Sequence, residues 1–357
     1  MSKVLVAMSG GVDSSVAAKL LKDQGYDLVG ATMKLRAEES VDTAGGHTCC
    51  SIDDVSDARQ VALKLGIPYY VFNFTEGFKE KIIDKFVNSY LSGVTPNPCI
   101  DCNRYMKFDK LFERADVLGC DHIATGHYVR VERVDGEYVL KKAVDPAKDQ
   151  SYVLYFLDQK TLKRLLFPLG GLNKSETRAI AEKEGLINAG KKDSQDICFV
   201  PDGKYAEVIK KFSEKVPLSG DYLDISGKVL GKHKGIIHYT LGQHKGLGLS
   251  TETKLFVVKI DPENNVVVLG EEKDLYKTTC EAEDFSFVSD KPRVFPFRCA
   301  AKVRYRQVEQ PATVYETETG VRIVFDEAQR AITPGQSAVL YDGDVVLGGG
   351  TITDRIY

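Results

Sequence analysis

A short loop of small residues follows the first apolar segment of the chain. Residues 4–8 are apolar, the run Ser9-Gly10-Gly11-Val12-Asp13-Ser14 comes next, and a helical pattern begins near its end. A glycine pair between a strand and a helix lets the backbone approach an anion closely, and the helix N-terminus offers N–H groups to it. The hydroxyls suit phosphate, and the carboxylate suits a magnesium ion. The loop therefore predicts a pyrophosphate site.

The first third of the chain alternates strand-like and helical patterns. Apolar runs occur at residues 4–8, 28–33, 69–72 and 123–124, with helical patterns between them, the later ones at 78–91 and 108–118. This order predicts parallel strands joined by crossover helices. We expect a polar break at residues 95–103, where prolines would stiffen a loop, and a hairpin turning at Asp135-Gly136. Asn173 and Glu176 predict the capped start of a helix over 177–184.

The second half of the chain is largely β. Short alternating runs separated by Gly, Pro, Asn and Asp occur at residues 256–260, 266–269, 313–316, 321–325 and 337–341. A break near 277–292 divides this half. The predicted fold is α/β plus β: a doubly wound parallel-sheet domain with a helical part (residues 1–205), a small central, mainly β linking domain (206–280) and a C-terminal β-barrel (281–357).

Composition excludes few classes of protein. The chain has 357 residues, 43% apolar and 28% charged, which is typical of a protein that folds in water. Its apolar runs are far shorter than the roughly 20 residues of a membrane helix, and its start lacks a signal-peptide pattern. We therefore expect a cytoplasmic location and no membrane partner. The net charge of −3 averages over the chain and does not decide whether a polyanion binds.

Three of the eight cysteines lie in polar segments that suggest chemistry. Cys99 and Cys102 form a CxxC pair after two prolines, a spacing that suits a shared metal or redox chemistry. Cys198 lies in DSQDICF, where a thiol fits either a buried apolar role or a reactive one. The vicinal pair Cys49-Cys50 is interpreted as a helix entry with buried thiols. We assign no catalytic role to Cys120, Cys280 or Cys299.

The SGGVDSS segment resembles the PP-loop of ATP pyrophosphatases, which split ATP between its α- and β-phosphates and attach AMP to a carbonyl or ureido oxygen. Taken with other segments in matching order, the whole chain resembles the bacterial tRNA 2-thiouridylases, the MnmA group. The further matching segments are NPCIDCN (97–103), ATGHY (124–128), KDQSYVL (148–154), DSQDICF (193–199), YTLGQHKGLG (239–248), RYRQ (304–307) and PGQSAV (334–339).

This resemblance implies a two-step reaction on the wobble uridine (position 34) of tRNA. ATP with Mg²⁺ would adenylate the uridine 2-oxygen and release pyrophosphate. Cys198 would then deliver sulfur as a persulfide and Cys102 would act as its partner, leaving AMP and a Cys102–Cys198 disulfide; alternatively, Cys102 would release hydrogen sulfide. The ATP-binding positions implied are Ala7, Met8, Ser9, Gly10, Gly11, Val12, Asp13, Ser14, Met33 and Gly126.

One departure from the group's commoner pattern concerns Cys99. Many members carry Asp at this position, so the acid–base role of that Asp does not transfer, although Asp101 lies nearby in the sequence. Three thiols, at Cys99, Cys102 and Cys198, could instead hold an iron–sulfur cluster with one iron open to sulfide. The persulfide and cluster mechanisms both stay open at this point.

The resemblance also implies tRNA contacts. A segment without acidic residues, 291–306, carries six Lys or Arg residues among three aromatic ones, a pattern that fits RNA binding or a solvated strand face equally. The positions implied to contact tRNA are Asn97, Pro98, Cys99, His127, Lys148, Asp149, Gln150, Arg304, Tyr305 and Gln336. We expect a monomer that acts on tRNAs for Lys, Glu and Gln and receives sulfur from a cysteine desulfurase or a relay protein.

Two other functions are compatible with the loop alone. An amidating PP-loop ligase would activate a small molecule and attack it with ammonia, and a tRNA- or metal-binding module would keep the loop as a remnant. The CxxC pair, DSQDIC and the lack of an appended glutaminase segment argue against the first. The intact SGGVDSS argues against the second.

Overall fold

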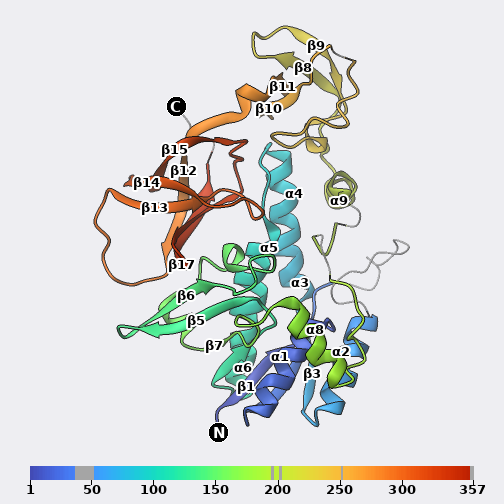
Figure 1. The fold of residues 1–357 in the computed structure, drawn as a ribbon. Helices are drawn as coiled ribbons and strands as arrows, with labels where there is room; N and C mark the ends of the chain where they lie inside the picture. Colours follow the sequence, from blue (N-terminus) through green and yellow to red (C-terminus); the bar gives the residue numbers. More distant parts are fainter. Residues whose placement is uncertain (37–51, 194–196, 201–202, 251, 354–357) are drawn as a thin grey trace.

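The computed structural model describes residues 1–36, 52–193, 197–200, 203–250 and 252–353. The chain begins in a layered α/β domain, passes through a small sheet at the opposite end of the molecule, and ends in a barrel between the two (Figure 1). Among the helices described, none has both the length and the apolar character needed to cross a membrane. The predicted Cys49-Cys50 pair lies outside the described residues.

The N-terminal domain is built on a parallel sheet with strand order β3-β2-β1-β4-β7. Its strands are β1 (Lys3–Ala7), β2 (Asp27–Lys34), β3 (Tyr69–Asn73), β4 (His122–Ala124) and β7 (Leu165–Leu166). Alternate side chains of a strand point to opposite faces: Val4 and Val6 pack into one apolar cluster and Leu5 into another. Helices therefore cover both faces, which confirms the doubly wound prediction.

The helices α1 (Val12–Asp23), α2 (Ile52–Lys64) and α8 (Lys174–Lys183) contribute to the apolar cluster that contains Val4 and Val6. The helices between β3 and β4 contribute to the cluster that contains Leu5. These are α3 (Thr75–Phe78), η2 (Lys79–Ile83), α4 (Asp84–Leu91), α5 (Pro98–Asp101), η3 (Cys102–Lys110) and α6 (Leu111–Val117), where η2 and η3 are π-helical. The start of α8 has the predicted capping box of Asn173 and Glu176.

The predicted polar break at 95–103 is partly wrong, because α5 begins inside it. The Asn97 side chain accepts a hydrogen bond from the Cys99 N–H, and Pro98 occupies the first turn. Proline has no N–H to lose there and its fixed φ suits a helix start. Pro98, one of the prolines that indicated a stiff loop, therefore begins a helix and places Cys99 in its first turn.

The predicted hairpin is confirmed as β5 (Val129–Val134) and β6 (Glu137–Lys142), with positive φ at both Asp135 and Gly136. It is not part of the N-terminal sheet, and β6 pairs with the barrel strand β17 (Val345–Ile352). The chain then forms η4 (Ser151–Val153), α7 (Gln159–Leu162), β7 and α8, and reaches the central domain through α9 (Tyr205–Phe212).

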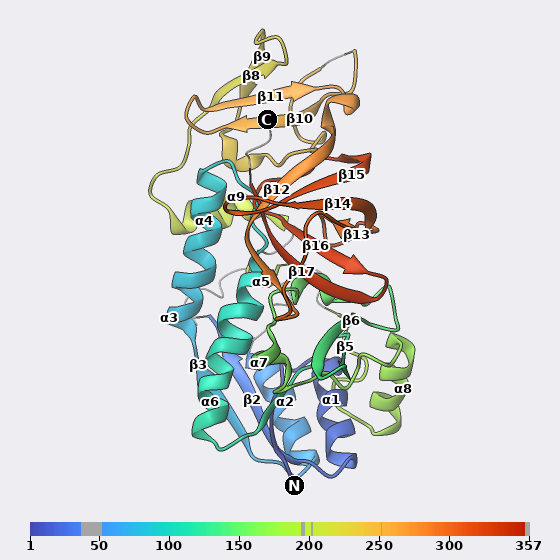
Figure 2. The ribbon, with the colours of Figure 1, turned by 90° about the vertical axis from the view of Figure 1, so that its left-hand side faces the viewer.

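The central domain is a sheet of order β10-β11-β8-β9, made of β8 (Gly220–Asp224), β9 (Val229–His233), β10 (Phe256–Asp261) and β11 (Val266–Gly270), with short helices η6 (Ile236–His238) and η7 (Glu272–Leu275). Six further strands form the barrel, which β12 closes by pairing with β17 (Figure 2). They are β12 (Tyr276–Phe287), β13 (Phe297–Lys302), β14 (Gln310–Glu316), β15 (Gly320–Arg330), β16 (Ser337–Asp342) and β17 (Val345–Ile352).

The expected break near residues 277–292 is wrong, because strand β12 occupies most of it. Its inward positions carry Cys280 and Ala282, which are fully buried in the barrel core, while Glu281 and Glu283 alternate with them. Small inward side chains give a weak apolar signal in the sequence. Barrel closure, which supplies pairing partners on both edges, stabilises this strand.

Candidate active site

The loop between β1 and α1 has the shape of an anion cradle. Gly10 has φ 76°, and a Cβ at this position would lie 2.2 Å from the Asp54 carbonyl oxygen. The Ser9 N–H donates to Ser14 Oγ (3.1 Å), which in turn donates to the Gly11 carbonyl (3.1 Å). Gly11 caps α1 without any side-chain bond to its first N–H groups. Those groups and the positive end of the helix dipole therefore suit phosphate.

The predicted nucleotide residues come together at one edge of the sheet. Strand β1 lies between β2 and β4, so the carboxyl ends that carry the loop, Met33 and Gly126 are neighbours. The chain order reverses at β1, which is where open α/β sheets bind ligands. A Cβ on Gly126 would lie 2.7 Å from the Ser14 nitrogen. The turn after β4 thus packs directly against the start of α1.

That contact gives a testable prediction. Gly126→Ala forces a methyl group against the α1 backbone, and overpacking of this kind costs about 1–3 kcal/mol. We expect ATP affinity to fall about tenfold or more, measured by nucleotide titration of the purified protein. Gly190→Ala is the control, since its Cβ would meet nothing within 4 Å. Equal ATP affinity for the two variants would show that the Gly126 turn does not shape the nucleotide site.

A network of charged side chains, not found from the sequence, surrounds Asp13. Asp13 Oδ1 accepts hydrogen bonds from the Tyr128 hydroxyl (2.8 Å) and Lys174 Nζ (2.7 Å). Lys174 also pairs with Asp193 (2.8 Å), which receives Lys148 and Arg178 as well. Burial alone would raise the pKa of Asp193, but bonds from Lys148 and Lys174 lower it. The network connects the loop to the segment that carries Cys198.

The segment that follows α8 also contacts the loop between β1 and α1. Asn188 Nδ2 donates to the Gly10 carbonyl (2.9 Å) and to Ser15 Oγ (2.9 Å). Lys191 Nζ reaches the same carbonyl (3.3 Å) and pairs with Asp54 and Asp57 at 2.7 Å. These contacts join positions between 134 and 181 residues apart, and no local sequence signal marks them.

The two predicted catalytic cysteines lie against one apolar core. Cys102 begins η3, directly after α5, and Cys198 precedes Phe199, whose ring packs edge-on against Phe78 and Phe86. Both cysteines are half-buried and border the same apolar cluster. Residues 194–196 of the DSQDIC segment lie outside the described residues. In contrast, burial raises the pKa of the Cys280 and Cys299 thiols to about 12, which fits their predicted lack of a catalytic role.

The three thiols proposed for an iron–sulfur cluster do not form a metal site in this structure. Across the described residues, no three His, Cys, Asp or Glu side chains are placed to hold an ion together. Cys99 is exposed, whereas Cys102 and Cys198 are half-buried. A cluster needs all of its thiolates around one inorganic core, so the donor arrangement does not fit the group.

Several residues predicted to contact tRNA lie where the barrel meets the N-terminal domain. The Tyr305 hydroxyl donates to the Asp149 carbonyl (3.2 Å), and Gln336 Nε2 donates to the Thr95 (2.9 Å) and Pro96 (3.2 Å) carbonyls. Burial raises the pKa of Tyr305, and Asp149 and Cys99 add to that rise. Tyr305 and Asp149 are therefore neighbours, although they are 156 residues apart in the sequence.

Several of these predicted side chains make internal contacts in this structure. His127 is 6% exposed, its Nδ1 lies 2.6 Å from Thr125 Oγ1, and burial holds its pKa well below the ordinary value. Lys148 pairs with Asp193, and Gln150 Oε1 accepts the Tyr128 N–H. Their contact with tRNA stays a prediction.

The basic run at 291–306 is partly structural. The Arg293 guanidinium lies 4.7 Å from the Phe297 ring centroid, and Arg298 forms a bidentate pair with Asp326 at 2.6 Å. These cations stabilise the barrel surface. Arg304, in the same run, donates through Nη2 to the Ala331 carbonyl (2.8 Å) and Thr333 Oγ1 (2.7 Å). Its charge has no carboxylate partner among the described residues, and its contact with tRNA stays a prediction.

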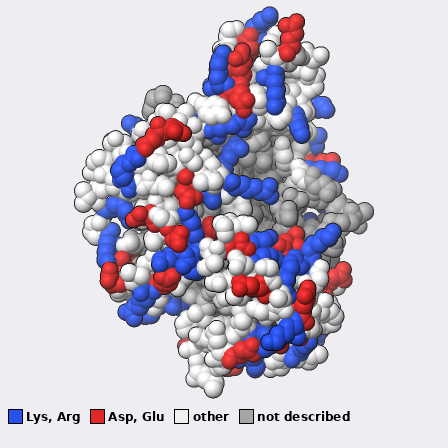
Figure 3. Space-filling view, in the orientation of Figure 1, with Lys and Arg blue, Asp and Glu red and all other residues white. Residues whose placement is uncertain are grey.

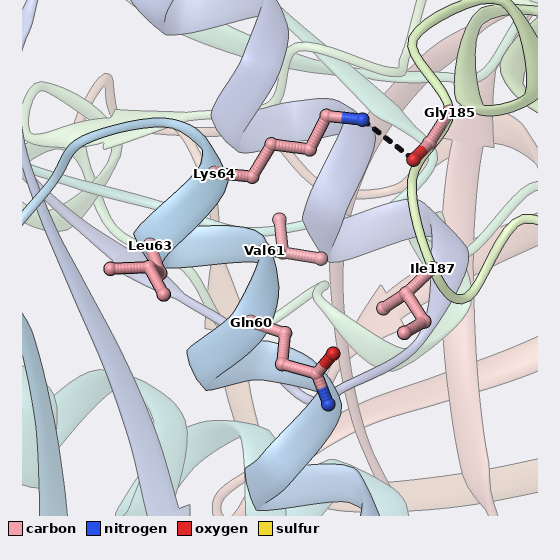
Figure 4. A pocket seen from close by; sticks show the side chains of 6 residues that line it. All are labelled: Gln60, Val61, Leu63, Lys64, Gly185 and Ile187. Atoms are coloured by element: carbon pink, nitrogen blue, oxygen red, sulfur yellow. Dashed lines mark hydrogen bonds between the residues drawn. The ribbon is translucent and has the colours of Figure 1, made fainter.

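A surface pocket beside α2 contains none of the predicted catalytic, ATP-binding or tRNA-binding residues. Gln60, Val61, Leu63, Lys64, Gly185 and Ile187 line it (Figure 4). Lys64 Nζ donates to the Gly185 carbonyl at 2.7 Å. The remaining lining is aliphatic apart from one amide, so the pocket offers no group for nucleotide chemistry.

A pyrophosphate cradle at the switch point of a doubly wound sheet defines the class of PP-loop ATP pyrophosphatases. Family models match three parts of the chain: a tRNA methyl transferase HUP domain (residues 2–202), a tRNA methyl transferase PRC-barrel domain (206–271) and an aminomethyltransferase β-barrel domain (277–352). Two curated relatives are named tRNA-specific 2-thiouridylase MnmA. That of Clostridioides difficile is 52% identical over 98% of both chains, and that of Clostridium acetobutylicum is 49% identical over 98% of this chain and 99% of its own. The chain belongs to the MnmA family of tRNA-specific 2-thiouridylases.

Proposed function

We propose that this chain is an ATP-dependent tRNA-uridine 2-sulfurtransferase that replaces the 2-oxygen of the wobble uridine with sulfur. The observation that carries the proposal is the combination of a pyrophosphate cradle with two half-buried thiols on one core, in a chain that matches 2-thiouridylases along its full length. Two of the matching families are named for tRNA methyl transfer, but a pyrophosphate cradle suits adenylation.

The first step activates the base. The uridine 2-oxygen attacks the α-phosphorus of ATP, the bond to the β-phosphate oxygen breaks, and pyrophosphate leaves. The N–H groups at the start of α1 and the loop hydroxyls would hold the phosphates, and Lys174 would compensate charge beside Asp13. We infer that Mg²⁺ arrives with ATP, because Asp13 Oδ1 is already bonded to Lys174 and Tyr128.

The second step transfers sulfur. The terminal sulfur of a Cys198 persulfide attacks C2, and AMP leaves with the former 2-oxygen. The Cys102 thiolate then attacks the Cys198 sulfur, which frees 2-thiouridine and forms a disulfide that an external thiol must reduce. In a second route, Cys102 attacks the Cys198 persulfide first and releases hydrogen sulfide, which attacks C2 itself. We favour these thiol routes over a cluster, because the donor arrangement does not fit one.

The proposal also covers the tRNA substrates, the sulfur donor and the domain boundaries of the chain. We infer a cytoplasmic monomer that acts on tRNAs for Lys, Glu and Gln and takes sulfur from a cysteine desulfurase or a relay protein. We propose the three domains expected from the sequence, 1–205, 206–280 and 281–357, with the second boundary moved toward the N-terminus. Strand β12 begins at Tyr276, so the second boundary belongs before that residue.

The test measures both steps in one reaction. The purified chain is incubated with unmodified tRNA, ATP, cysteine and a cysteine desulfurase, while pyrophosphate release and 2-thiouridine are followed. We expect tRNA to stimulate pyrophosphate release and 2-thiouridine to appear at position 34. Release that responds to a small carboxylate and ammonia, and not to tRNA, would instead identify an amidating ligase and overturn the proposal.

A further inference from the structure

A cluster of cations surrounds one buried ring where the central domain meets the barrel. Phe256 begins β10 and is 2% exposed. Lys254 Nζ lies 5.2 Å and the Arg330 guanidinium 5.4 Å from its ring centroid, and the His244 ring lies at 5.5 Å. Together with exposed Lys245, these side chains form what we call the Phe256 patch: His244, Lys245, Lys254 and Arg330.

The charge of the Phe256 patch is poorly compensated. Lys245 and Lys254 form no ion pair with another described residue, and Arg330 has a 3.3 Å contact to the exposed carboxylate of Glu272. Burial, followed by Lys254 and Lys245, lowers the pKa of His244. Gathering like charges costs free energy, and a bound polyanion removes that cost. Figure 3 shows Lys and Arg side chains along the edge of a hollow between the central domain and the barrel.

The Phe256 patch continues directly into the predicted tRNA site. Gly242 has φ 85°, and a Cβ there would lie 3.6 Å from Arg330 Nη1 and 3.8 Å from Arg304 Nη2. Arg304 Nη2 also contacts the Leu241 carbonyl at 3.3 Å. The loop that carries His244 and Lys245 is therefore held between Arg304 and Arg330. An anion that runs past Arg304 meets the Phe256 patch next.

We propose that the Phe256 patch binds the sugar–phosphate backbone of tRNA, beyond the nucleotides that enter the active site. The inference rests on the proposed function and extends it to a surface outside the catalytic domain. Phe256 is too buried to stack on a base, so the contact is electrostatic and independent of sequence. Its role is to position the RNA and supply affinity, without a part in either chemical step.

The test is charge reversal in the full chain with Lys245→Glu/Lys254→Glu. We expect tRNA affinity to fall about tenfold or more, and the slope of log affinity against log salt to drop by about 2, one for each lost phosphate contact. KM for tRNA should rise, while kcat and KM for ATP stay unchanged. The neutral Lys245→Gln/Lys254→Gln pair, with a thermal melt, separates lost charge from lost folding.

The matched control reverses two lysines on β9 and the turn before it, Lys228→Glu/Lys232→Glu, because β9 is the strand farthest from β10 in the central sheet. These changes should leave the salt slope close to that of the wild type. If the wild type thiolates tRNA but the Phe256 patch variant keeps wild-type affinity and slope, this inference falls and the proposed function stands. Unchanged tRNA affinity with lost transfer from the sulfur donor would overturn it in favour of a protein partner. A wild type that neither binds nor thiolates tRNA would overturn both.

Discussion

Cys198→Ser is expected to abolish 2-thiouridine formation, by more than about a thousandfold, while tRNA-dependent pyrophosphate release continues. A serine hydroxyl cannot hold a sulfane sulfur, so the second step loses its carrier, whereas the cradle for the first step lies on β1, β4 and α1. Pyrophosphate release and nucleoside analysis of the same reaction measure the two steps separately.

The control for this prediction is Cys299→Ser, which makes the same chemical change at another half-buried cysteine, in barrel strand β13. Burial raises the pKa of its thiol to about 12, so it carries little thiolate and we expect normal thiolation. Normal sulfur transfer by Cys198→Ser would remove Cys198 from the mechanism and leave the thiol routes without a carrier.

Asp13→Ala is expected to remove both steps, with pyrophosphate release reduced about a hundredfold or more. The substitution deletes the acceptor of Tyr128 and Lys174, and it leaves the Lys174 ammonium with Asp193 as its carboxylate partner. The site then loses the carboxylate that holds Lys174 and the Tyr128 hydroxyl in place beside the phosphates. Single-turnover pyrophosphate release at saturating ATP measures the loss.

Asp23→Ala is the matched control, since it removes a carboxylate from the last turn of the same helix, where Asp23 pairs with Lys19 at 2.6 Å. An exposed pair of this kind contributes little to stability, so activity should be unchanged. Asp13→Asn adds a second comparison, because it keeps an oxygen for Tyr128 and removes the charge. Wild-type pyrophosphate release by both Asp13 variants would refute the assignment of this loop.

The features that could be predicted from the sequence are local ones. A glycine pair after an apolar strand, the Asn173 cap and the Asp135-Gly136 turn each act within a few residues, because φ preferences and capping bonds are short-range. All three appear in the structure where the residues indicated. The break expected near 277–292 failed for the opposite reason: β12 depends on partners from β15 and β17, which lie far along the chain.

The sequence by itself determined a nucleotide loop on a doubly wound sheet, a β-rich second half and three cysteines to consider. The tertiary structure decided which of these residues meet. It placed Lys174 between Asp13 and Asp193 and packed Gly126 against α1. On the barrel surface, it placed Arg293 over the Phe297 ring and paired Arg298 with Asp326. Among the described residues it brings no three candidate ligands together as a metal site, and it places Lys254 and Arg330 beside the Phe256 ring. Such contacts join distant segments, and only the packing of the whole chain fixes them.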